Sequence, residues 1–64
     1  MSLITTKNID DHDGAYADLI AAHKGLNAEQ SAGLNARLVL ILMNHVGDRA
    51  VIREALDLAR VSGT

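Results

Sequence analysis

The chain has 64 residues, a formal net charge of −2 and no cysteine. A chain of this length forms one domain at most, and the lack of cysteine excludes disulfides, thiolate zinc sites and a thiol nucleophile. The acidic balance gives no reason to expect nucleic acid or an anionic membrane as a partner. Because a single core of this size supplies only roughly 3–5 kcal/mol, we expect assembly with another chain to complete it.

The composition favours helices. Proline is absent, and alanine and leucine, both strong helix formers, are frequent. Tyr16 is the only aromatic residue, so the core must be aliphatic, without stacking platforms for bases, flavins or sugars. The longest apolar run, Leu38 to Met43, is far shorter than the ~20 residues that span a bilayer. We therefore expect a soluble, cytoplasmic, all-α protein without a membrane segment.

Residues 1–9 have no helical periodicity, and we expect them to form an extended arm before a single domain over residues 10–64. The first helix is expected at about 11–24. Aspartates at its start can accept the unpaired N–H groups of a first turn, and a cation followed by Gly25 is a typical C-terminal signal. One stripe of this helix, which we expect to be buried, carries Tyr16, Leu19, Ile20 and His23.

The second helix is expected at about 28–46. Asn27 is a good N-cap, Gln30 completes a capping box, and Gly47 ends the helix. From Leu38 to Met43 the helix is apolar all round, and such a helix is normally buried on most sides. Two short helices of the same chain cannot easily cover it, so its apolar side chains form the predicted interface: Leu34, Leu38, Val39, Leu40, Ile41, Leu42, Met43 and Val46.

The third helix is expected at about 49–61, with Asp48 as its cap. Its inner face should be apolar, and one flank carries Arg49, Arg53 and Arg60. Short connections place consecutive helices side by side or at a sharp corner. The expected fold is thus a three-helix all-α domain with the central apolar second helix, completed by homo-oligomerisation. A two-fold homodimer is the first expectation, because such dimers are the commonest assembly.

The candidate ligand site is a polar cluster at the end of the second helix. Asn44, His45 and Asp48 could bind a metal or a metabolite, together with His23 if the inner faces of the first two helices meet. The structural alternative is that His45 is an interface residue and Asp48 a helix cap. Two histidines are too few for a typical zinc site, so we predict no metal and no cofactor.

DNA binding by a helix-turn-helix-like arrangement is a remote alternative, and no catalytic class is indicated. Arginines on a helix that follows a glycine corner loosely resemble a helix-turn-helix, but Glu54 and Asp57 beside them favour a solvated, salt-bridged surface. No phosphate-binding glycine loop or nucleophile motif is present in the sequence, so no catalytic residue is predicted. The sequence favours an interaction module over an enzyme.

The chain resembles a family of short bacterial proteins catalogued as a domain of unknown function, the 2783 family. The resemblance extends over about residues 10–60, and the Asn-His-Val-Gly-Asp stretch at 44–48 is its most specific part. It implies a bacterial, cytoplasmic, helical protein without an assigned activity. It also implies an association with flavin-dependent hydroxylases of aromatic compounds, to which the chain could be an accessory.

Overall fold

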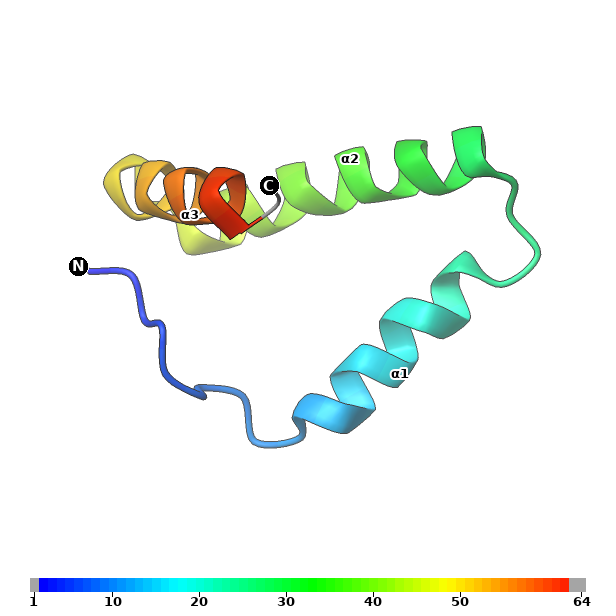
Figure 1. Cartoon of the computed structure of the whole chain (residues 1–64), viewed down its shortest axis with the longest axis horizontal. Helices are drawn as coiled ribbons and strands as arrows, with labels where there is room; N and C mark the ends of the chain where they lie inside the picture. Colours follow the sequence, from blue (N-terminus) through cyan, green and yellow to red (C-terminus); the bar gives the residue numbers. More distant parts are fainter. Residues whose placement is uncertain (1, 63–64) are drawn as a thin grey trace.

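The computed structural model describes residues 2–62, and these residues form three helices and no strand. Helix α1 spans His12–His23, α2 spans Ala28–Val46 and α3 spans Arg49–Ser62 (Figure 1). The all-α architecture of three helices is therefore confirmed. None of the helices in residues 2–62 has the length and apolar character needed to cross a bilayer.

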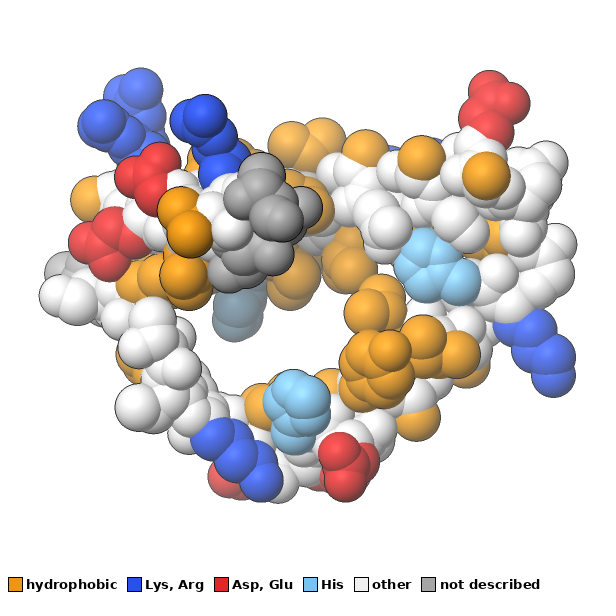
Figure 2. Space-filling model, in the orientation of Figure 1, with side chains coloured by type: hydrophobic (Ala, Val, Ile, Leu, Met, Phe, Trp, Pro, Cys, Tyr) orange, Lys and Arg blue, Asp and Glu red, His pale blue; other side chains and the backbone are white. Residues whose placement is uncertain are grey.

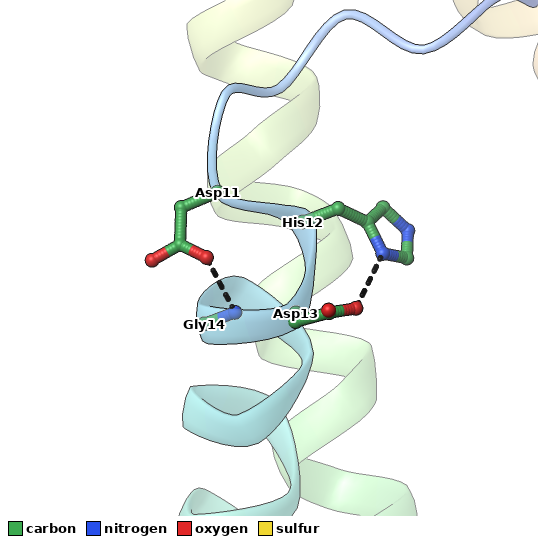
Figure 3. Close-up of polar contacts among 4 residues, drawn as sticks. All are labelled: Asp11, His12, Asp13 and Gly14. Atoms are coloured by element: carbon green, nitrogen blue, oxygen red, sulfur yellow. Dashed lines mark hydrogen bonds and ion pairs between the residues drawn. The ribbon is translucent and has the colours of Figure 1, made fainter.

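Helix α1 starts where a carboxylate can cap it. The Asp11 side chain accepts a hydrogen bond from the backbone N–H of Gly14, at 2.9 Å, and so satisfies one unpaired donor of the first turn (Figure 3). The His12 Nδ1 atom lies 4.0 Å from a carboxylate oxygen of Asp13, and both side chains are exposed. The helix ends before Gly25, whose φ of 81° lies in the left-handed region.

The ends of α2 also follow from local chemistry. Asn27 Oδ1 accepts from the N–H of Gln30 at 2.8 Å, and Gln30 Oε1 accepts from the N–H of Asn27 at 3.0 Å, which completes the predicted capping box. Gly47 ends the helix with a φ of 68°. Asp48 then caps α3 by accepting from the N–H of Ala50 at 3.0 Å.

The three helices do not pack into a closed bundle. Helices α2 and α3 contact one another, whereas α1, which ends before the corner at Gly25, diverges from α2 at an angle (Figure 1). The N-terminal segment passes beside α3, where the N–H of Leu3 donates to Glu54 Oε2 at 3.2 Å. The radius of gyration is 13.2 Å, compared with about 10.7 Å for a compact chain of this length.

As a result, a single chain has almost no core. Val51, which is 8% exposed, is the one buried residue within the described part of the chain. The stripe on α1 that was expected to be buried is open: Tyr16 is 58% exposed and Ile20 is 54% exposed. That expectation is wrong for one chain, because α1 diverges from α2 and its apolar residues are spread around the helix.

Candidate assembly surface

A large apolar surface lies between α1 and α2. In Figure 2 a gap passes through the molecule, and hydrophobic side chains border it. We call this surface the α1–α2 groove; its volume is about 660 Å³. Its lining is mostly aliphatic and comprises Ile9, Ala15, Asp18, Leu19, Ala22, Leu34, Arg37, Leu38, Ile41 and Leu42.

A second apolar hollow lies between α2 and α3, and we call it the α2–α3 groove. Its volume is about 280 Å³ and its lining contains no charged side chain. The residues that line it are Val39, Leu42, Met43, Val46, Ile52, Ala55, Leu56 and Ala59. Because Leu42 belongs to both grooves, the two surfaces are continuous across α2.

The predicted interface residues therefore fall on three sides of α2. Leu34, Leu38 and Ile41 line the α1–α2 groove, and Val39, Met43 and Val46 line the α2–α3 groove. Leu40 lines neither groove and is 65% exposed. At 100° per residue, Leu40 lies on the opposite side of the helix from Leu38. The apolar surface is thus concentrated on the sides of α2 that face α1 and α3.

Two opposite charges lie in the otherwise apolar α1–α2 groove. Asp18 comes from the middle of α1 and Arg37 from the middle of α2. Neither has an ion-pair partner among the residues that the structure describes. The guanidinium of Arg37 lies over Gly33: a Cβ built on that glycine would be 3.2 Å from Arg37 Nη1.

The residues of the predicted ligand site lie at two separate places. Asn44 and His45 are exposed in the last turn of α2, and Asp48 accepts the N–H groups that begin α3. His23 instead bonds to Asn35 Oδ1, with 3.0 Å between the atoms. Since Asn35 precedes His45 by ten positions in the same helix, His23 is held about 15 Å along α2 from His45.

In the structure Asn44, His45 and Asp48 are close in the chain, and His23 is remote from them. The ligand site itself stays a prediction. Within residues 2–62, no three His, Asp or Glu side chains are grouped so that they could hold a metal ion. The contact of His23 with Asn35 was not predicted, because it depends on the angle between α1 and α2. A histidine before a glycine corner, with a polar residue in the next helix, was the only signal for it in the sequence.

Comparison with known proteins gives a family and no activity. Residues 3–61 match the model of a family described as a protein of unknown function, DUF2783. The chain belongs to this family. No curated protein and no solved structure matches the chain. Membership confirms the resemblance drawn from the sequence and assigns no activity to the chain.

Proposed function

We propose that this member of the family is a helical self-assembly module, in which the apolar sides of α2 are covered by a second copy of the chain. The observation that carries the proposal is the accessible surface of one chain, 5657 Å². A compact monomer of 6.8 kDa exposes about 3,950 Å². One chain thus leaves roughly 1,700 Å² more surface in water than a compact fold of the same mass.

That excess has the size of a permanent interface. A standard interface buries about 800 Å² on each partner, and obligate homodimers bury roughly 1,000–2,500 Å² on each. At about 25 cal/mol per Å² of apolar area, burying half of the excess as apolar surface contributes about 20 kcal/mol per chain before the entropy of association and ordering is subtracted. An interface of this size also fits a chain with one buried residue in its described part.

The chemistry of the exposed surface supports the same conclusion. The exposed side chains of α2 include Val39, Leu40, Ile41 and Leu42 in succession, and Ile41 is 64% exposed. All of these residues except Leu40 line one of the two grooves beside α2, and a monomer rarely keeps an apolar patch of this kind in water. Two-fold homodimers are the commonest way in which such a patch is covered, so we propose a dimer as the smallest assembly.

A metabolic enzyme as a further partner is a separate proposal that rests on the family resemblance alone. Binding of a metabolite by Asn44, His45 and Asp48 is the alternative function from a different class. Thermal shifts of the purified chain over a panel of metabolites test the alternative, with His45→Ala as the matched variant. A ligand that stabilises the native chain and not this variant would support a binding site.

The test of self-assembly is the solution mass, measured by light scattering behind a sizing column over a wide range of concentrations. We expect a dimer for the native chain and a monomer, or an unfolded chain, for Ile41→Glu. The matched control is Leu40→Glu, which places the same charge one residue away on the side of α2 that lines neither groove. A folded, monomeric native chain, seen by circular dichroism and scattering together, would overturn the proposal.

A further inference from the structure

The pair of charges in the α1–α2 groove indicates which surface a second copy covers, given the self-assembly proposed above. Asp18 and Arg37 line the same groove, and all its other lining residues are apolar. An unpaired charge buried in an apolar interface is energetically costly. A chain that covers the groove must therefore place an opposite charge beside each of the two. The occupant therefore has to present one cation and one anion, spaced as these two are.

A second copy of this chain meets that requirement. In a two-fold interface the same patch is used by both chains, so residue i contacts residue j and residue j contacts residue i. Asp18 of one chain would then face Arg37 of its partner, and Arg37 would face Asp18. A patch that carries one charge of each sign is complementary to itself under this symmetry, whereas a patch of one sign would repel its own copy.

The position of the two residues in their helices agrees with this symmetry. Asp18 lies midway along α1, which spans His12–His23, and Arg37 lies midway along α2, which spans Ala28–Val46. When α1 of one chain lies antiparallel along α2 of the other, the middle of α1 faces the middle of α2, and the two-fold axis repeats the same contact on the other side.

The α2–α3 groove does not offer such a recognition element. Its lining residues are all apolar, so nothing in it fixes the register of a partner helix. Charged pairs across an interface set register and exclude wrong partners more than they add affinity. Of the two grooves, the α1–α2 groove is thus the larger, and it alone has charged residues in its lining.

We propose that the α1–α2 groove is the dimer interface, and that two symmetry-related ion pairs between Asp18 and Arg37 select a second copy of this chain and fix its register. Leu34, Leu38 and Ile41 form the apolar centre of this interface. The two charged residues are its recognition residues, and Leu40 points away from the partner.

A charge-reversal experiment on the full chain tests this pairing. Asp18→Arg gives a patch with two cations, and Arg37→Asp gives a patch with two anions, so each variant repels its own copy. We expect each single variant to self-associate roughly tenfold to a hundredfold more weakly than the native chain. An equimolar mixture of the two variants should form the mixed dimer in preference to either homodimer, which native mass spectrometry distinguishes by mass.

The double variant Asp18→Arg/Arg37→Asp exchanges the two charges and should regain native self-association. This recovery separates lost pairing from lost folding, because a misfolded single variant would not be rescued by a second reversal. The assigned interface would be overturned if both single variants dimerise with native affinity and their mixture contains homodimers and mixed dimers in statistical proportion. Self-assembly itself would still hold in that case if Ile41→Glu dissociates the chain. A monomeric native chain would overturn both proposals.

Discussion

The Nε2–H of His23, the last residue of α1, donates to Oδ1 of Asn35 in α2, with 3.0 Å between the two atoms. This hydrogen bond links two helices that otherwise diverge from the corner at Gly25 (Figure 1). It joins the C-terminal end of α1 to α2 and so contributes to the angle between the two helices.

Removing the Asn35 side chain should loosen α1 more than it changes overall stability. An exposed hydrogen bond contributes only about 0.5–1 kcal/mol, and Asn35→Ala regains up to about 0.7 kcal/mol of helix propensity. The appropriate measurement is therefore hydrogen exchange, which we expect to become faster over residues 12–23. Asn44→Ala makes the same change at the other end of α2 and should leave exchange in α1 as it is. Equal exchange in the two variants would mean that the His23 contact does not hold α1.

The capping box of α2 should contribute measurably to the free energy of unfolding. Asn27→Ala removes the side chain that accepts the N–H of Gln30 and should lower the free energy of unfolding by about 1 kcal/mol. Asn27→Asp keeps an acceptor at the same place and should retain most of that stability. Urea unfolding at a fixed chain concentration gives both values, since the stability of an assembly depends on concentration. Equal midpoints for alanine and aspartate would show that the cap does not contribute.

Two glycines in and after α2 should respond to alanine in opposite directions. Gly47 has a φ of 68°, so Gly47→Ala should destabilise the chain by about 1–2 kcal/mol, although the space around its Cβ is open enough. Gly33 is inside the helix, where alanine is favoured by about 1 kcal/mol. Its new Cβ would meet only the end of the Arg37 side chain, which can move. Thermal unfolding compares the two variants, and a stabilising Gly47→Ala would contradict the left-handed conformation.

The corner between α2 and α3 should be the part of one chain that is most sensitive to truncation. Val51→Ala removes two methyl groups from the residue that is 8% exposed, and it should cost about 1–3 kcal/mol. Val61→Ala makes the same truncation on α3 at a residue that is 76% exposed, and it should cost less than about 0.5 kcal/mol. Chemical unfolding of the two variants at one concentration checks the difference. A larger loss of unfolding free energy for Val61→Ala would indicate that Val61 lies in an interface outside the two grooves.

The sequence by itself determined the helices and their ends. Capping depends on side chains within three residues of the helix start, so Asn27 with Gln30 and Asp48 with the first turn of α3 could be predicted without a tertiary fold. Glycine at positions 25 and 47 supplied the left-handed residues that end α1 and precede α3. The surplus of apolar side chains on α2, which motivates self-assembly, was equally visible, because composition and period need no coordinates.

Only the tertiary structure decided which side chains share a surface. The angle between α1 and α2 is set at a corner of a few residues, and no periodicity encodes it. That angle exposes Tyr16 and Ile20, which a helical wheel assigned to a buried stripe. It also brings His23 to Asn35 and away from His45, and it places Asp18 and Arg37 in one groove. Contacts between residues far apart in the chain depend on the relative placement of rigid helices, which local sequence cannot specify.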